Sequence, residues 1–532
     1  MTRHIVVVAI PLWGHTRPLC VFISKLQKAS KCLVTFFIPE LLLAKVKAEI
    51  ARQYEKGEED LLASIRIISI LDSNRDNGDL PKVIAAYTSV YAEPYTALVN
   101  GKELTCTTGK VYEPAPFPSA VILDFLAPYQ LHATREITAN RVPIFAWVTG
   151  SAPVIIRYYC PENVGGLGDV VGRAKKNLEE KGGVLERYIE AEYGNITGQA
   201  IHIPGMPPMY DYECFPQELP FSEPLFNTME GKLFQTLNDS DGTIINTSEA
   251  YESVFIETLR SWLDEFNKDF YSVGPTIPLD FSAGELKFES HNQSGQLQNG
   301  EVNKERNASQ AEVELFLDNA LEKYGKESVI FISFGSTFWP KDPAFVEEIL
   351  NVLIEKDFPF IFAYGSPAAK LPDDLKSSPK GLLAKWVPQQ YILNHPALGW
   401  FLTHCGQGST TEALASGIPM ICYPFTSDQP FNAAYLSLTL DVAFELIHIR
   451  TGALGTRPPL RLGGSTKPLS TREAVREEFA KVVDDARGAV GKRKRANAQR
   501  IKRLLGKAWQ EEEGGLEVRE LKKFVDGYCV DK

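Results

Sequence analysis

Residues 386–429 read WVPQQYILNHPALGWFLTHCGQGSTTEALASGIPMICYPFTSDQ, and their pattern indicates an α/β fold. The apolar run at 399–403 predicts a buried strand, residues 409–416 predict a helix, and the apolar run at 419–423 predicts the next strand. Strand, helix and strand in this order are typical of a parallel sheet. The turn at 403–409 contains two glycines, so backbone N–H groups and the positive end of a helix can hold an anion there.

The same alternation extends over most of the chain in two series, which predicts two α/β domains. Strands are expected at residues 5–10, 33–38, 65–70, 120–123, 143–148 and 243–246, and then at 328–333, 358–364, 382–385, 399–403 and 419–423. The polar segment 281–311 predicts a linker between a first domain, residues 1–280, and a second domain, residues 312–512. A Gly-, Pro- and Leu-rich stretch at 451–468 precedes one long charged helix predicted over 472–511.

Composition excludes several classes of protein. The chain has 532 residues, 44% of them hydrophobic, and no apolar run approaches the roughly 20 residues of a membrane-spanning helix. The net charge of −11 argues against a nucleic-acid partner, and the basic cluster at 492–495 is expected to be a solvated helix face. The eight cysteines form no CxxC pair, which predicts neither a disulfide framework nor a zinc site. With an amino-terminal apolar run too short for a signal peptide, we expect a cytoplasmic protein.

Other turns of the second domain carry polar or flat side chains at strand ends. Ser336 and Thr337 follow the strand at 328–333 and offer small hydroxyl and amide donors. Trp386 and Gln389 follow the strand at 382–385, where an indole can stack on a nucleobase. Because ligands of open α/β sheets bind at the carboxyl ends of strands, we expect these turns to form one ligand site.

Each of these residues has a plainer interpretation when taken alone. Ser409 and Glu412 form the pattern of a capping box, which would explain both as residues that start a helix. Trp386 can equally be a core residue, and His404 a buried histidine with its hydrogen bonds satisfied. Their occurrence together and in this order favours the ligand site.

The 44-residue stretch 386–429 resembles, without a gap, the donor-binding signature of the UDP-dependent glycosyltransferase superfamily of the plant secondary-product type. The resemblance implies that Trp386 stacks on uracil, Gln389 lies at the nucleoside and Glu412 takes the ribose hydroxyls. It further implies that His404 and Ser409 hold the diphosphate and that Asp428 and Gln429 hold the sugar. The donor-binding residues expected from these turns and from the resemblance are Ser336, Thr337, Trp386, Val387, Gln389, His404, Gly406, Gln407, Gly408, Ser409, Glu412, Asp428 and Gln429.

One departure from that family pattern concerns the sugar. Gln407 and Gly408 stand where the plant branch usually has Trp and Asn before the serine. The sugar contacts at this place stay open. Glucose is the donor sugar that the resemblance favours, and galactose, xylose, glucuronic acid and N-acetylglucosamine remain alternatives.

The first domain contains a histidine and a carboxylate at strand ends. His15 lies in the loop PLWGHTRP after the first strand, and Asp124 ends the strand at 120–123. Sugar transfer to a hydroxyl needs a base and a group that orients it, and histidine is a suitable base. The resemblance implies that His15 is the catalytic base, that Asp124 orients it, and that Thr149 reaches the sugar. Taken alone, His15 can be a loop histidine and Asp124 a helix N-cap.

The resemblance covers nearly the whole chain and implies the GT-B fold, with two facing Rossmann-like domains, a cleft between them and a last helix, residues 513–532, returning to the first domain. It implies an inverting transferase that needs no metal and no cofactor, the UDP-sugar being a co-substrate. We expect a monomer acting on a small hydroxylated acceptor, aromatic or lipophilic, beside the apolar residues Phe125, Trp147 and Tyr158.

Three other classes of function fit the sequence less well. A nicotinamide-dependent oxidoreductase is disfavoured because no GxGxxG follows the first strand. A sugar-nucleotide epimerase would lack the signature at 386–429. A catalytically silent sugar-nucleotide-binding protein is disfavoured by the presence of both His15 and Asp124.

Overall fold

The computed structural model describes residues 3–72, 80–218, 236–278, 300–335, 338–366, 368–371, 380–464, 466–510 and 514–530. The chain folds into two compact units. Unit 1 comprises residues 1–195, 223–278 and 507–532, and unit 2 comprises residues 196–222 and 279–506. This division differs from the predicted one in placing 196–222 with the second unit, although the segments on both sides of it belong to the first.

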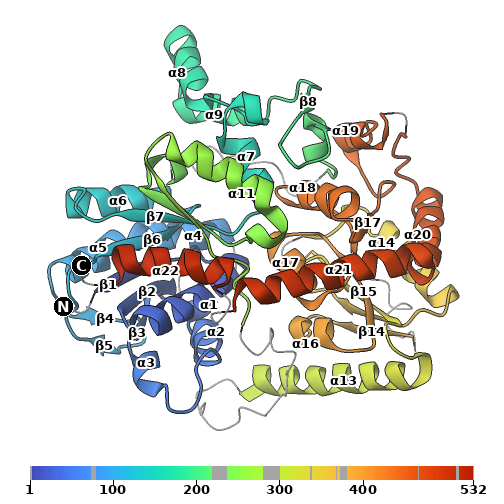
Figure 1. Cartoon of the computed structure of the whole chain (residues 1–532), viewed down its shortest axis with the longest axis horizontal. Helices are drawn as coiled ribbons and strands as arrows, with labels where there is room; N and C mark the ends of the chain where they lie inside the picture. Colours follow the sequence, from blue (N-terminus) through green and yellow to red (C-terminus); the bar gives the residue numbers. More distant parts are fainter. Residues whose placement is uncertain are drawn as a thin grey trace. The chain divides into compact units, whose positions relative to one another are not determined.

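Unit 1 contains a seven-stranded sheet in the order β11-β10-β7-β6-β1-β2-β3, with every neighbouring pair parallel (Figure 1). Its strands are β1 (His4–Val8), β2 (Leu33–Pro39), β3 (Ile65–Leu71), β6 (Ala120–Asp124), β7 (Ile144–Val148), β10 (Gly242–Ile245) and β11 (Asp269–Ser272). Its helices are α1 (Trp13–Ser30), α2 (Glu40–Ala51), α3 (Glu59–Ala63), α4 (Leu80–Val90), α5 (Ala92–Val99), α6 (Pro128–Thr138), α7 (Ala152–Tyr159), α8 (Val170–Lys181), α9 (Leu185–Tyr193), α11 (Glu249–Asp264) and α22 (Leu516–Tyr528). The last helix, α22, packs against α1 and β11.

Unit 2 contains a six-stranded parallel sheet in the order β14-β13-β12-β15-β16-β17 (Figure 1). Its strands are β12 (Val329–Ser333), β13 (Phe360–Ala363), β14 (Gly381–Ala384), β15 (Leu398–Thr403), β16 (Met420–Cys422) and β17 (Ala443–Glu445). Its helices are α13 (Gly300–Tyr324), α14 (Ala344–Glu355), α16 (Gln389–Asn394), α17 (Gln407–Ser416), α18 (Gln429–Ala434), α19 (Gly452–Gly455), α20 (Arg472–Arg487) and α21 (Ala489–Ala508). The prediction of two Rossmann-like domains is confirmed.

Both sheets are buried on both faces, which explains why their strands read as continuous apolar runs. All five residues of β1 and all six of β15 are buried. A parallel sheet acquires this pattern because its crossover helices cover both of its faces. The first unit has its own apolar core, and a second core lies around β12, β13 and α14 in unit 2.

The prediction of one long helix over 472–511 is wrong, because the chain forms two helices, α20 and α21, which are separated at Gly488. That glycine has an extended backbone (φ −90°, ψ −164°) and ends α20. The basic cluster in α21 is only partly the solvated face that we expected, because Lys492 and Arg493 are exposed but Lys494 is buried and Arg495 is half-buried. Lys494 and Arg493 each lie 2.7 Å from the carboxylate of Asp441, and Arg495 lies 2.9 Å from Glu327. These charges are therefore neutralised within unit 2.

The predicted linker, residues 281–311, lies outside the described residues up to residue 299, and its remainder belongs to α13. The stretch 451–468 has a partner that the sequence did not suggest. Tyr212 donates its hydroxyl to the carbonyl of Pro458 at 2.6 Å, and the guanidinium of Arg457 lies over the Tyr212 ring at 3.9 Å.

Buried charges join the same two segments. Arg461 forms ion pairs with Glu213 and Glu445, and Glu445 also pairs with Arg450 at 2.9 Å. All four side chains are at most 6% exposed. Residues 196–218 are therefore held in unit 2 by residues 445–461.

Candidate functional site

A histidine and a carboxylate meet at the carboxyl edge of the unit 1 sheet. His15 is the third residue of α1, which follows β1, and Asp124 is the last residue of β6. The two strands are parallel neighbours, with Val8 opposite Leu123, so the segments that follow them start side by side. The Nδ1 atom of His15 lies 2.9 Å from the Oδ2 atom of Asp124. The structure thus brings the predicted pair into hydrogen-bonding contact.

The surroundings of this pair fix the orientation of the imidazole. Asp124 is fully buried, and its second oxygen accepts the backbone N–H of Leu126 at 2.9 Å. The ring of Phe125 stacks on that of His15 with 5.7 Å between centroids and 8° between planes. The carboxylate assigns the proton to Nδ1, and this tautomer leaves a lone pair on Nε2. His15 is 20% exposed and can therefore meet a ligand.

Thr149 lies just beyond β7, the strand next to β6 in the sheet, and is almost fully buried. The turn that carries it is held at its far end by Glu252, whose carboxylate accepts the N–H of Ala152 at 3.2 Å. No local pattern indicated this role for Glu252, because the two residues lie 100 positions apart. The contact of Thr149 with a sugar stays a prediction.

The three apolar residues expected beside the acceptor have different surroundings. Phe125 stacks on the His15 ring. Trp147 is fully buried and stacks on Phe22, so it is a core residue. Tyr158 packs edge-on against Tyr193.

The donor loop, residues 403–409, joins β15 to α17 in unit 2. The helix begins at Gln407 with Gly406 as its N-cap, two residues earlier than predicted. The interpretation of Ser409 and Glu412 as a capping box is therefore wrong. Ser409 is the third residue of the helix and is half-buried, and Glu412 lies within the helix. This start places the first turn of α17, whose leading N–H groups have no carbonyl partner one turn back within the helix, directly after His404.

The imidazole of His404 fits between two glycines. A Cβ atom on Gly335 would lie 3.0 Å from the ring, and one on Gly406 would lie 2.7 Å from its Nε2 atom. Any other residue at either position would push the ring away, and Gly335 also has φ +75°, which favours glycine. Burial lowers the pKa of His404 to about 4, although a hydrogen bond with the backbone of Ser333 opposes the shift. The ring is therefore neutral at physiological pH.

Two further turns contribute residues named by the sequence. Trp386 is 45% exposed, so the core interpretation of this residue is wrong, and Val387 next to it is buried. Gln389 opens α16 and donates its amide to Glu412 at 2.7 Å, while Gln390 donates to the other oxygen of Glu412 at 2.9 Å. Glu412 is thus joined to α16 by both oxygens. Ser336 and Thr337 lie outside the described residues.

Asp428 and Gln429 stand at the start of α18, beside the donor loop. The Oδ2 atom of Asp428 accepts the first N–H of α17, from Gln407, at 2.9 Å. The side-chain oxygen of Gln429 accepts the N–H of Phe425 at 2.8 Å. A buried asparagine one turn further on, Asn432, donates to the carbonyl of Cys405 at 2.8 Å. Sequence reasoning missed Asn432, although its spacing of four from Asp428 places both on one helix face.

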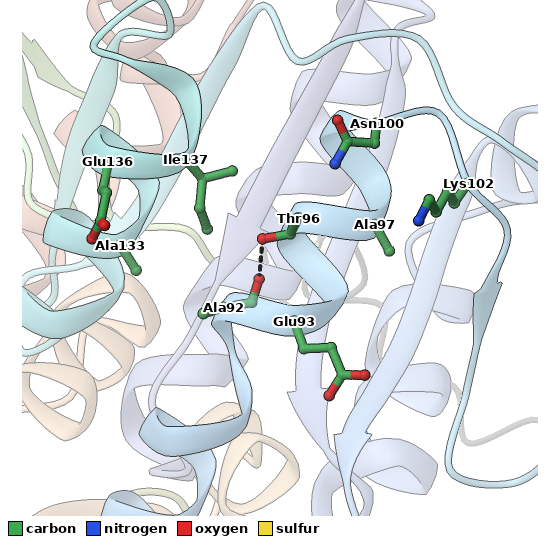
Figure 2. Close-up of a pocket in the computed structure, with 9 residues that line it drawn as sticks. All are labelled: Ala92, Glu93, Thr96, Ala97, Asn100, Lys102, Ala133, Glu136 and Ile137. Carbon is green, nitrogen blue, oxygen red and sulfur yellow. Dashed lines mark hydrogen bonds between the residues drawn. The ribbon is translucent and has the colours of Figure 1, made fainter.

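No cluster of metal-ligating side chains occurs among the described residues, and no described helix is long and apolar enough to span a membrane. A surface hollow of about 620 Å³ lies in unit 1 between α5 and α6 (Figure 2). Its lining carries the charged residues Glu93, Lys102 and Glu136, and Thr96 donates to the carbonyl of Ala92 at 2.7 Å. None of its nine lining residues was singled out by the sequence.

Known proteins resemble this chain both in part and over its whole length. Residues 294–448 match the family described as UDP-glucoronosyl and UDP-glucosyl transferase. UDP-glycosyltransferase eriJ of Hericium erinaceus is 29% identical over 531 residues, which cover 96% of this chain and 96% of that protein. Linamarin synthase 1 of Manihot esculenta is 29% identical over 255 residues, covering 46% of this chain and 48% of that protein.

Solved structures share the fold. A UGT transferase from Siraitia grosvenorii in complex with UDP has a TM-score of 0.66 at 18% identity, over 99% of this chain and 100% of that one. Phytolacca americana UGT2, complexed with UDP-2-fluoro-glucose and pterostilbene, has a TM-score of 0.63 at 20% identity, with the same coverage. The predicted GT-B fold class is confirmed by these neighbours and by the two parallel sheets.

The family match at 294–448 contains the donor loop, α17 and the start of α18, which are the elements that gather His404, Glu412 and Asp428. The match to eriJ extends the similarity to unit 1, with its His15–Asp124 pair. The family match at 294–448 and the similarity to a UDP-glycosyltransferase over 96% of the chain support the UDP-glycosyltransferase superfamily, whose named members transfer a sugar from a UDP-sugar.

Proposed function

We propose that this enzyme transfers a hexose, glucose, from a UDP-sugar to a hydroxyl of a small hydrophobic acceptor and inverts the configuration at the anomeric carbon. The observation that carries the proposal is the contact of 2.9 Å between His15 Nδ1 and the buried carboxylate of Asp124. A histidine held in this way through Nδ1 has its other ring nitrogen, Nε2, as the base.

The reaction is a single displacement. Nε2 of His15 takes the proton of the acceptor hydroxyl while that oxygen forms a bond to the anomeric carbon of the sugar. The bond between this carbon and the diphosphate oxygen breaks, and UDP leaves with the electron pair. Attack from the face opposite the leaving group inverts the anomeric configuration. Asp124 stabilises and orients the imidazolium that forms.

The donor loop has the features needed to hold the departing diphosphate. The first turn of α17 offers backbone N–H groups at the positive end of a helix, and Gly406 and Gly408 let a ligand approach the main chain closely. Because His404 is neutral, it contributes an N–H hydrogen bond rather than a positive charge. We propose that these donors stabilise the leaving group without a metal ion or another cofactor.

Two sets of observations support the choice of substrates. Several relatives carry names of glucosyltransferases, such as UDP-glucosyltransferase 74AE2 of Panax ginseng, which supports glucose. The apolar ring of Phe125 beside His15 supports an acceptor with an aromatic or lipophilic body.

All eight cysteines are free thiols, which supports a reducing compartment, the cytoplasm, for an enzyme proposed to act as a monomer.

The test is an assay of the purified protein with a panel of UDP-sugars and hydroxylated aromatic and lipophilic acceptors. We expect highest turnover with UDP-glucose, a product whose anomeric proton shows the inverted configuration by NMR, and unchanged turnover after treatment with a chelator. A retained configuration would contradict the single displacement. Loss of activity with the chelator would contradict metal-independent transfer, and absence of product from every UDP-sugar would contradict the function.

A further inference from the structure

We propose that Asn432 is a positioning residue of the donor loop and that Gln407 acts on the donor through it. The inference rests on the proposed function, because it concerns how the same enzyme holds its UDP-sugar. Asn432 lies in α18, is 3% exposed and has no place in the family signature at 386–429.

Three acceptors surround the amide nitrogen of Asn432. Its shortest hydrogen bond, 2.8 Å, goes to the carbonyl of Cys405 in the donor loop. The side-chain oxygen of Gln407 and the Oδ2 atom of Asp428 each lie 3.4 Å away. One buried amide therefore faces the loop, the first residue of α17 and the residue that starts α18.

The hydrogen bond from Asn432 is made to a residue of the donor loop with an unfavourable backbone conformation. Cys405 has φ +67°, a left-handed conformation that a residue with a side chain rarely adopts. Its carbonyl is held by Asn432 and by the hydroxyl of Thr410 at 3.3 Å. Because the neighbouring peptide groups carry His404 and Gly406, a change in the direction of this carbonyl would move both sides of the diphosphate site.

Gln407 gives the second part of the inference. Its side chain is 3% exposed, and its oxygen points at Asn432, so it faces the protein interior. Its backbone N–H is bound by Asp428. By contrast, Gly408 is exposed, and a Cβ added to it would meet nothing within 4 Å. At the two positions that depart from the plant pattern, the Gln407 amide thus faces the protein interior, and Gly408 leaves the surface open.

The same amide pair connects the loop to the start of α18. Asp428 accepts from Gln407 through the oxygen atom that also faces Asn432. A carboxylate that accepts two N–H groups in this way is fixed in direction. Asn432 consequently sets the orientation of Asp428 as well as that of the loop, without touching the donor itself.

The experiment compares Asn432→Ala, Gln407→Ala and the double variant with the wild type. We expect Asn432→Ala to raise the KM for UDP-glucose and the Kd for UDP by about tenfold, with kcat and the acceptor KM changed less than about threefold. Gln407→Ala should have a smaller effect of the same kind. The double variant should equal Asn432→Ala, because Gln407 acts through Asn432.

The matched control is Asn497→Ala. Asn497 also donates its amide to a backbone carbonyl, that of Asp441 at 3.1 Å, but this contact precedes β17 at the opposite edge of the sheet from the donor loop. The Asn497→Ala variant should lower Tm and leave the KM for UDP-glucose unchanged. If Asn432→Ala does not fold, Asn432→Ser keeps a hydroxyl donor and should show a weaker form of the same change in UDP affinity.

Two results would overturn the inference. One is an Asn432→Ala enzyme that loses stability as Asn497→Ala does but binds UDP like the wild type. The other is a double variant in which the two single effects multiply. If the wild type transfers no sugar, the proposed function fails, and titration of the same variants with UDP still decides the role of Asn432.

Discussion

The carboxylate of Glu252 accepts the backbone N–H of Ala152 at 3.2 Å and the hydroxyl of Thr247 at 2.9 Å. Ala152 is the first residue of α7, and its N-cap, Ser151, makes no side-chain capping bond. A carboxylate from a distant helix, α11, therefore caps α7. The positive end of α7 in turn stabilises the buried charge of Glu252.

We predict that Glu252→Ala lowers the free energy of unfolding by about 1–3 kcal/mol, because it leaves the N–H of Ala152 buried without a partner. Glu252→Gln should cost less, since an amide oxygen can still accept. Urea denaturation measures both. The control is Glu257→Ala, an exposed position on the same helix, which should stay within about 0.5 kcal/mol of the wild type. Equal midpoints for the Glu252→Ala and Glu257→Ala proteins would contradict the cap.

We predict that His15→Ala lowers kcat at least about a hundredfold and leaves the Kd for UDP nearly unchanged, because the base acts on the acceptor proton. Asp124→Asn should also lower kcat, since an amide facing Nδ1 no longer fixes the tautomer. Initial rates and titration calorimetry with UDP measure the two quantities. Wild-type turnover in the His15→Ala enzyme would refute the assigned base.

We predict that Glu412→Ala weakens UDP binding by about tenfold or more, because Glu412 accepts from both Gln389 and Gln390 and is expected to take the ribose hydroxyls. Titration with UDP measures the change. Glu473→Ala, an exposed carboxylate at the start of α20, is the control and should bind as the wild type does. Equal affinity in both variants would remove Glu412 from the nucleoside site.

We predict that His404 makes the fold less stable in acid. Because its pKa in the folded protein is about 4, below the ordinary value of 6.5, the unfolded chain binds a proton between these two values that the folded chain does not. The stability that the neutral His404 ring contributes to the fold is fully present above pH 6.5 and is lost as the pH falls toward 4.

Unfolding free energies of the wild type and of His404→Gln at pH 7 and pH 4.5 test this. The advantage of the wild type over the variant should shrink by about 2 kcal/mol at the lower pH. Parallel pH profiles would show that the His404 ring is not held neutral.

The strands and the donor stretch could be predicted because their signals are local. Apolar runs indicated the β1, β2, β3 and β15 strands, and the order of residues at 386–429 carried the resemblance. Within the two large sheets, two strands were not predicted, β11 and β17, which have four and three residues and contain the charged residues Asp269 and Glu445. Short strands of this kind are recognised only through the neighbours that pair with them.

The start of α17 shows why the remainder was out of reach. The local pattern favours Ser409 as the N-cap, but the N–H of Gln407 is bound by Asp428, 21 residues further along the chain. That contact stabilises a helix which begins earlier, and no propensity of residues 403–412 contains it. Asn432 and Glu252 were missed for the same reason, since each acts on a segment that only the fold brings near.

The buried charges around Arg461 limit how this enzyme can be recombined with its relatives. A chimera that exchanges amino-terminal halves near residue 280 replaces Glu213, and a replacement without an acidic residue there removes one of the two carboxylates that pair with Arg461. A buried cation that loses its partner is strongly destabilising, by about 3–5 kcal/mol. Residues 196–218 and residues 445–461 must therefore be taken from the same parent protein, even though more than two hundred positions separate them in the sequence.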